Sequence, residues 1–142
     1  MQDSNSKYLL IEERAGGTIV LYNPSGRWEA GETLAETAAR EAAEESGVIF
    51  APEWFLGSYV TMHTALSGQR VCTVRFAFGA TLVPGLPLCA RDPGILDVHW
   101  LTYNEVTNSR SRHRSSAVLR CIDDFRAGHR YPLDAVNHMI DS

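Results

Sequence analysis

The sequence lacks the features of a membrane or exported protein. No apolar run among its 142 residues approaches the roughly 18 residues of a membrane-spanning helix. The first six residues do not show the basic and then apolar pattern of an export signal. We therefore expect a cytoplasmic protein without a membrane anchor. The chain also lacks internal repeats, low-complexity tracts and linkers, so its length predicts a single domain over residues 1–142.

Cysteine and positive charge are both scarce. Cys72, Cys89 and Cys121 are widely spaced and form no Cys-x-x-Cys pair, so we predict buried thiols rather than a zinc site. With 13 basic and 17 acidic residues the net charge is −4, which gives no positive field for nucleic acid. What is present, 44% hydrophobic and 21% charged residues, is the composition of an ordinary globular domain.

The order of apolar runs and turn residues predicts a mixture of strands and helices. Runs rich in Val, Ile, Phe, Tyr and Thr favour strands, and Gly and Pro separate them. Because no regular βαβ repeat appears, we expect an α+β fold with a mixed sheet packed on helices. The expected strands cover residues 7–12, 18–22, 54–64, 70–82 and 97–101, with Pro84, Gly85 and Pro87 ending the hairpin of the third and fourth.

The expected helices have recognisable ends. Thr33 and Glu36 have the spacing of a capping box, and Gly47 is placed to end the helix that they begin, over residues 33–46. Thr102 and Glu105 repeat that spacing before a short helix. A further helix is expected from Ser115 or Ser116 to residue 125, and a last one from residue 132.

Six of the 17 acidic residues lie between Glu29 and Glu45. On a helix, Glu41, Glu44 and Glu45 project from one flank because they are three and four residues apart. Like charges at this spacing destabilise a helix by roughly 0.2–0.5 kcal/mol per pair, which a bound divalent cation would more than reverse. Taken alone, the cluster is also what a solvated glutamate-rich helix looks like, and that is the simpler interpretation.

The spacing of residues 26–48 favours the cation. This segment resembles the Nudix box of the Nudix hydrolases: Gly, five residues, Glu, seven residues, Arg-Glu, an aliphatic residue, any residue, Glu-Glu, any residue, Gly and an aliphatic residue. Seven fixed identities make a chance match on the order of 10⁻⁹ to 10⁻⁸ per start position. The resemblance implies a Nudix-like α/β/α sandwich, with Ala42 as the one departure. The matching residues are Gly26, Glu32, Arg40, Glu41, Glu44, Glu45, Gly47 and Val48.

Three glutamates of the box match the family's metal site. The resemblance implies that Glu41 and Glu45 are the principal ligands of Mg²⁺, with Mn²⁺ as an alternative ion, and that a backbone carbonyl at Ser25 or Gly26 joins them. Glu44 is a further ligand, a water holder or the general base, so the catalytic candidates are Glu41 and Glu44. Such a site assists the attack of water on a phosphoanhydride bond.

Two other box residues are expected to be structural. Arg40 and Glu32 match an ion pair that ties the loop to the helix.

Because the glutamates are expected on a solvated flank of the helix, Glu45→Gln should lower turnover by orders of magnitude and leave folding nearly unaltered.

Residues 23–29 and 114–134 also resemble the NudJ phosphatase subgroup. Its members are small Mg²⁺-dependent phosphatases that release phosphate from nucleoside tri- and diphosphates, hydroxymethylpyrimidine pyrophosphate and thiamine pyrophosphate. The resemblance implies the same hydrolysis here, on a small-molecule substrate without nucleic acid or membrane, by a monomer or homodimer. Two alternatives stay open: a pyrophosphatase for ADP-ribose or oxidised nucleotides, and a catalytically silent nucleotide-binding module.

Two departures from the subgroup lead to further expectations. Relatives carry another strand before residue 7, so the sheet is expected to lack its usual first strand, either because the recorded start is internal or because the protein compensates. A neighbouring strand would then be an exposed edge. Many Nudix enzymes also have an acid six residues before Trp100, where this chain has Gly94, and Asp92 is the nearest substitute.

The candidates for substrate binding are Arg27, Arg114 and Trp28. Arg114, with neighbouring Arg112, could clamp phosphate, because a guanidinium matches phosphate oxygens in a bidentate fork, although surface arginines look the same. Trp28 could stack on a ring.

Other side chains are weaker candidates. Tyr22 and Phe76 could also stack on a ring, but aromatics in predicted strands more often belong to the core. His63 and His113 are the two histidines that we would place near a ligand.

Overall fold

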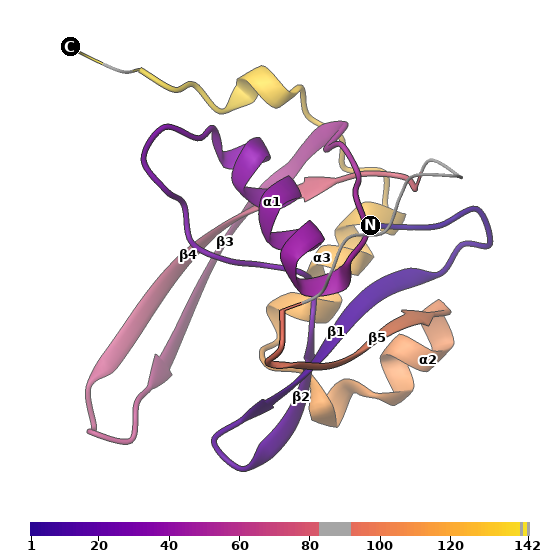
Figure 1. Ribbon diagram of the computed structural model, residues 1–142, viewed down its shortest axis with the longest axis vertical. Coiled ribbons are helices and arrows are strands. Elements are labelled where there is room, and N and C mark those ends of the chain that lie inside the picture. Colours follow the sequence, from indigo (N-terminus) through magenta and orange to yellow (C-terminus); the bar gives the residue numbers. More distant parts are fainter. Residues whose placement is uncertain (83–91, 140, 142) are drawn as a thin grey trace.

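The computed structural model describes residues 1–82, 92–139 and 141, and its described strands form two antiparallel units (Figure 1). In the first, β1 (Tyr8–Ala15) lies between β2 (Thr18–Tyr22) and β5 (Ile95–Leu101). In the second, β3 (Trp54–Thr64) pairs with β4 (Arg70–Gly79) as a long hairpin. Strands and helices are mixed along the chain, which confirms the α+β class.

Helix α1 (Leu34–Ser46) begins and ends as the sequence predicts. The Thr33 side chain accepts a hydrogen bond from the Glu36 amide, and the Glu36 carboxylate accepts one from the Thr33 amide, which completes the capping box. Gly47 ends the helix with φ of 72°, a left-handed conformation that glycine adopts without strain. The helix that carries the motif is therefore fixed at both ends by local sequence.

The remaining helices are shorter. The capping box of α2 (Tyr103–Asn108) is also present, and α3 (Ala117–Arg126) follows a 3₁₀ turn at Arg110–Arg112. The last predicted helix is a 3₁₀ turn, Leu133–Ala135, with Pro132 before it. Figure 1 shows α1 in front of the strands and α3 behind them, as expected for an α/β/α sandwich.

The stretch before β1 connects the two strand units. Gln2 bridges antiparallel to Tyr8 and parallel to Thr81. The Gln2 amide donates to the Ala80 carbonyl (3.2 Å), and the Leu82 amide donates to the Gln2 carbonyl (3.0 Å). Where the usual first strand was expected to be missing, the structure has this short bridge. The described strands themselves pair antiparallel, so the expected mixed sheet is not seen in them, and the parallel contact of Gln2 with Thr81 is an isolated bridge.

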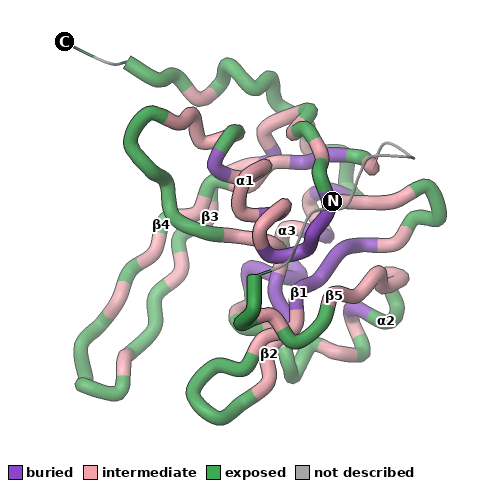
Figure 2. The backbone as a smooth tube through the Cα atoms, in the orientation of Figure 1, coloured by how far each residue is buried: buried purple, intermediate pink, exposed green. Residues whose placement is uncertain are grey.

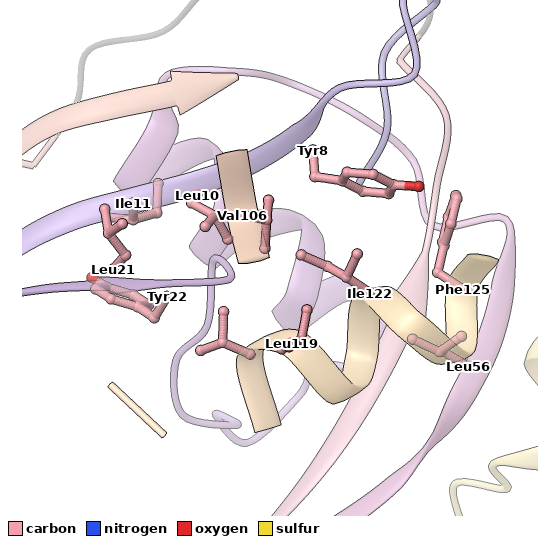
Figure 3. Packing of buried hydrophobic residues seen from close by; sticks show 11 residues of the cluster. Tyr8, Leu10, Ile11, Leu21, Tyr22, Leu56, Val106, Leu119, Ile122 and Phe125 are labelled. Atoms are coloured by element: carbon pink, nitrogen blue, oxygen red, sulfur yellow. The ribbon is translucent and has the colours of Figure 1, made fainter. Parts of the chain in front are cut away.

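The core lies between β1, β2 and α3 (Figure 3). The buried face of α3 carries Val118, Leu119, Ile122 and Phe125, at the spacing of an amphipathic helix. Phe125 meets the Tyr8 ring edge to face at 5.9 Å. Burial of these side chains holds β2 in place, and β2 leads directly into the motif loop.

The β3–β4 hairpin is much more exposed than the core, and it projects away from it (Figures 1 and 2). Cys72 is exposed on β4 and Cys121 is half-buried, so the prediction of a buried thiol was wrong for Cys72. Strand β4 ends at Gly79, earlier than predicted. Cys89, Pro84, Gly85 and Pro87 lie outside the described residues. No helix in the described ranges is long and apolar enough to cross a membrane.

Candidate active site

Two carboxylates hold the loop before α1 against the helix. The Ser25 amide donates to Oε1 of Glu45 at 2.7 Å. The next residue, Gly26, lies directly on the Glu41 carboxylate, and a Cβ at position 26 would overlap it. Only glycine therefore fits here without moving Glu41. The first residue of the motif and one of its glutamates are coupled by this contact.

Glu45 is buried, with 7% of its surface exposed. The Tyr22 hydroxyl donates to its Oε2 at 2.6 Å. Burial raises the pKa of Glu45 to about 7, and the nearby charge of Glu41 adds to that shift, while the bonds from Tyr22 and Ser25 oppose it. The expectation of a solvated flank was wrong for this residue, because β2 and the loop cover that side of α1.

Tyr22 links Glu45 to a second carboxylate and to an arginine. Its hydroxyl lies 3.0 Å from Oε2 of Glu13, and Arg114 pairs with the same Glu13 oxygen at 2.7 Å. The Arg114 guanidinium also lies over the Tyr22 ring, 3.4 Å from its centroid. Burial and the two carboxylates raise the pKa of the Tyr22 hydroxyl. Arg114, predicted to bind substrate, thus touches the site through Tyr22.

Arg40 organises the other side of α1. Its Nε meets Oε1 of Glu32 at 2.5 Å, which is the predicted ion pair between loop and helix, and its hydrogen bond holds the pKa of Glu32 well below the usual range. Arg40 Nη1 also reaches Oε1 of Glu41 (2.9 Å) and Oε2 of Glu44 (3.3 Å). Glu44 is 45% exposed there. The prediction missed these two contacts, although the spacing of Arg40 and Glu44 indicates the second.

The remaining candidates lie at different distances from this centre. The Asp92 amide donates to the Glu44 carbonyl at 2.7 Å, which brings this exposed residue beside the carboxyl-terminal part of α1. Arg27 is exposed, and its carbonyl accepts from Arg40 at 3.0 Å. Trp28 is 57% exposed on the same loop. These loop residues flank the glutamates.

Other predicted ligand residues are placed elsewhere. Arg112 pairs with Glu12 at 2.6 Å. The backbone of His113 forms a β-bridge with Leu21, and its Nε2 lies 3.3 Å from the Ser109 hydroxyl. Burial lowers the pKa of His113, as suits a structural histidine. His63 is exposed near the tip of the hairpin.

Sequence reasoning missed two residues of the site. Tyr22 was considered only as a ring that could stack on a ligand. No feature of the sequence near Tyr22 indicates the hydrogen bond from its hydroxyl to Glu45. Glu13 is brought to the same hydroxyl by the pairing of β1 with β2, a contact that depends on strand register. Both residues come from strands, so only the folded sheet shows that they belong with the helix.

The donor chemistry of this site fits a hard divalent cation. In the described part of the chain, no three acidic, His or Cys side chains are grouped closely enough to hold a metal ion as they stand. Glu41 and Glu45 contact adjacent residues of one loop, and burial is the main cause of the raised pKa of Glu45, with the charge of Glu41 adding to it. The residues that would principally hold the cation are Glu41 and Glu45, with a loop carbonyl, and Glu44 would serve as a further ligand, a water holder or the base.

Comparison with known proteins agrees with the geometry. The NUDIX domain family model matches residues 1–120. Phosphatase NudJ of Escherichia coli (strain K12) is 32% identical over 133 residues, 94% of this chain and 84% of that protein.

Two solved structures are also similar. A NUDIX hydrolase from Nitrosomonas europaea has a TM-score of 0.79 at 35% identity, covering 96% of this chain and 91% of its own. A MutT protein from Methanosarcina mazei Go1 shares the fold, with a TM-score of 0.60 at 19% identity and coverage of 91% and 90%. Together with a glycine packed on a motif glutamate, these matches show that the chain belongs to the Nudix hydrolases and is a homologue of the NudJ phosphatase.

Proposed function

We propose that this protein, as a single domain over residues 1–142, is a Mg²⁺-dependent phosphatase that also accepts Mn²⁺. Its proposed substrates are nucleoside tri- and diphosphates and related pyrophosphates such as hydroxymethylpyrimidine pyrophosphate and thiamine pyrophosphate. The relatives named above support the reaction class, since NudJ is a phosphatase. The particular substrates are our proposal.

The proposal rests on the environment of Glu45. A buried carboxylate is stable as an anion only with a compensating charge. In the described residues no Arg or Lys pairs with Glu45, and its bonds come from a neutral hydroxyl and a neutral amide. A divalent cation held by Glu45 and Glu41 would supply that charge.

Each motif residue has a proposed task. When bound, the cation spreads charge from the phosphoryl oxygens and lowers the pKa of water. Glu41 and Glu45 present oxygens beside the Ser25–Gly26 loop. Glu44, nearly half exposed, can accept the proton of the attacking water. Arg40 pairs with Glu41 and Glu44 and so restricts the motion of both side chains.

Substrate binding is proposed for the loop side of the site. Arg27 and Trp28 are exposed next to Gly26, so they can meet a phosphate and the group attached to it. Arg114 is also proposed to bind the substrate, and its guanidinium lies over the Tyr22 ring.

A phosphate-release assay tests the proposal. The panel contains nucleoside tri- and diphosphates, hydroxymethylpyrimidine pyrophosphate, thiamine pyrophosphate, ADP-ribose and an oxidised guanosine triphosphate, each with Mg²⁺ and with EDTA. We expect Mg²⁺-dependent release of single phosphates. A nucleoside monophosphate from ADP-ribose or release of pyrophosphate would show the alternative hydrolase. Thermal stabilisation by nucleotides without any product would show a silent binding module, and would overturn the proposal.

A further inference from the structure

Strand β3 has one edge that stays open beyond its first residues. On one side it pairs with β4, and on the other side Phe55 is paired with Tyr131, through backbone hydrogen bonds of 2.8 and 2.9 Å. Beyond that pair, no described residue pairs with the second edge over residues 57–64. These residues span roughly 26 Å of strand with unpaired backbone groups. The contact with Tyr131 shows that this edge accepts an antiparallel strand.

A groove of about 420 Å³ runs along the open edge. Six consecutive residues of β3, 56–61, line it. Because the side chains of a strand alternate between its two faces, consecutive residues share one groove only at the edge of the strand. The opposite wall is one flank of α3, where Ser116, Arg120 and Asp124 follow each other at intervals of four residues. A space between a strand edge and a helix flank has the shape that an added strand fills.

The open part of β3 lacks the usual protection of an edge strand. Such edges are normally protected by charged side chains, by proline or by a bulge. Strand β3, Trp54–Thr64, contains no Asp, Glu, Lys, Arg or Pro, whereas β1, β4 and β5 all carry charged residues. Its one bulge, between Phe55 and Gly57, lies at its base. Beyond the bulge, nothing in the strand opposes pairing with another strand.

An uncharged edge is what pairing with a second copy requires. In a two-fold dimer, each residue near the axis faces the same residue of the other copy, so a charge there would meet a like charge. At the centre of the open part, the residues that would face themselves are Val60 and Thr61. Neither side chain is charged, so two copies of this edge are compatible with each other.

The two faces of β3 also suit self-pairing. On the outward face, Val60 is 68% exposed and Met62 is 63% exposed, and Val74, which lies opposite Val60 on β4, is 56% exposed. On the other face, the Tyr59 hydroxyl donates to Asp124 of α3 at 2.8 Å. A two-fold axis perpendicular to the sheet brings each face next to the same face of the partner. The exposed apolar side chains of both copies then cover one another.

Pairing would also support the hairpin. A two-stranded hairpin alone is marginally stable in water, and a stable sheet usually needs three strands or more. The β3–β4 hairpin projects from the core, and the residues of its projecting part are exposed or half-buried (Figures 1 and 2). Two copies joined at β3 form one four-stranded sheet, in the order β4, β3, β3, β4.

We propose that residues 57–64 of β3 form a dimer interface, at which two copies of this chain pair antiparallel about a two-fold axis perpendicular to the sheet. The incoming strand fills the groove, with its polar face toward Ser116 and Arg120. An edge of this length buries less than the roughly 800 Å² per partner of a standard interface, so the dissociation constant is expected at about 1–100 µM. This interface does not depend on the proposed function.

The mass of the full chain in solution gives the first test. Sedimentation velocity from about 1 to about 500 µM should show the mass rising from 15.7 kDa to twice that value. A mass of 15.7 kDa at every concentration would overturn the proposal. Growth beyond the dimer would contradict it too, because a two-fold interface closes after two copies.

The matched pair Val60→Lys and Val74→Lys locates the interface. Both residues are exposed on the same face and lie opposite each other in the hairpin, but only Val60 belongs to the open edge. In Val60→Lys, two like charges meet at the axis, so the dissociation constant should rise at least about tenfold. Val74→Lys should stay within about threefold of the wild type. No change in Val60→Lys, or an equal change in both, would contradict an interface at the edge of β3.

A third variant tests whether Val60 faces its own copy. Val60→Glu alone should be as monomeric as Val60→Lys, and an equimolar mixture of the two should dimerise again, because opposite charges then meet. Circular dichroism of each variant checks that the fold is kept, as expected for a side chain that is 68% exposed. Folded variants whose mixture stays monomeric would contradict two-fold pairing at this position.

Hydrogen exchange shows the paired backbone directly. Amides of residues 57–64 should exchange more slowly at high than at low protein concentration, whereas those of β4 should exchange equally at both. Equal exchange of residues 57–64 at both concentrations would overturn the pairing. These measurements need no substrate, so they stand or fall separately from phosphate release.

Discussion

Glu44 and Glu45 are neighbours in sequence but lie on two different flanks of α1. On the inner flank, Glu45 is 7% exposed and is held by Tyr22 and Ser25, and the pKa of Glu45 is about 7. On the outer flank, Glu44 is 45% exposed and pairs with Arg40 at 3.3 Å. We propose that one helix in this way separates two tasks: the inner carboxylate binds a cation, and the outer one exchanges a proton with solvent.

The largest effect is expected from the inner flank. Glu45→Gln keeps the shape of the side chain and removes the buried charge, so the cation loses a principal ligand. We expect kcat/KM for phosphate release to fall by roughly 10³-fold or more, about 4 kcal/mol of transition-state stabilisation. Circular dichroism should show an unchanged fold, because the Gln amide can still bond to Tyr22 and the Ser25 amide. Wild-type turnover in this variant would remove the distinction between the flanks.

The metal-free protein should show the same residue in its pH dependence. Glu45 has a pKa of about 7 in the fold against 4.5 as its reference value. Below the lower value the carboxyl is protonated in both states. As pH rises from about 4.5 to 7, the unfolded chain releases this proton first, so the free energy of unfolding falls by about 3 kcal/mol through Glu45.

Denaturant unfolding in EDTA between pH 4.5 and 8 measures this effect. Wild type should lose that stability as pH rises, and Glu45→Gln should lack the loss. Parallel curves for the two proteins would mean that Glu45 carries no penalty on the inner flank.

A smaller loss is expected on the outer flank. Glu44→Gln removes a proton acceptor that solvent can partly replace, since Glu44 is nearly half exposed. We expect kcat to fall about 10²-fold, near the lower end of general-base effects, with little change in Mg²⁺ affinity. Initial rates over a range of Mg²⁺ concentrations separate kcat from the metal requirement. A loss as large as that of Glu45→Gln, with weakened Mg²⁺ affinity, would place Glu44 among the principal ligands.

We expect the smallest effect from a change at Tyr22, whose hydroxyl bonds to Glu45 on the inner flank. Tyr22→Phe removes the hydroxyl that Glu45 shares with Glu13, so we expect about a tenfold loss of kcat/KM, the worth of one hydrogen bond to a charged group. Tyr59→Phe is the matched control, because the Tyr59 hydroxyl also donates to a carboxylate, that of Asp124 (2.8 Å), away from the motif. The control should lose stability only. Equal kinetic losses in both variants would indicate a general effect of destabilisation.

Much of the helix could be predicted from sequence, because its determinants are local. The capping box at Thr33 and Glu36, the end at Gly47 and the Arg40–Glu32 ion pair depend on residues close along the chain. The motif spacing also identified the family, which the comparisons show independently.

What could not be predicted depends on tertiary contacts. The burial of Glu45 needs the position of β2, which brings Tyr22 over the helix, and no spacing within the motif indicates it. Likewise, the hydrogen bond from the Leu34 amide to His138 joins residues over a hundred positions apart, so no local pattern indicates it. Exposure of Cys72 was missed because a free cysteine is usually buried, whereas this hairpin extends beyond the core.

We propose that the glutamates of α1 bind a divalent cation. Isothermal titration of Mg²⁺ and Mn²⁺ into the wild type, Glu41→Gln and Glu45→Gln at pH 6.5 tests it most directly. We expect binding by the wild type with release of a proton, because Glu45 must ionise, and at least about tenfold weaker binding without that release in Glu45→Gln. Equal affinity in all three proteins, or no binding by the wild type, would contradict the claim.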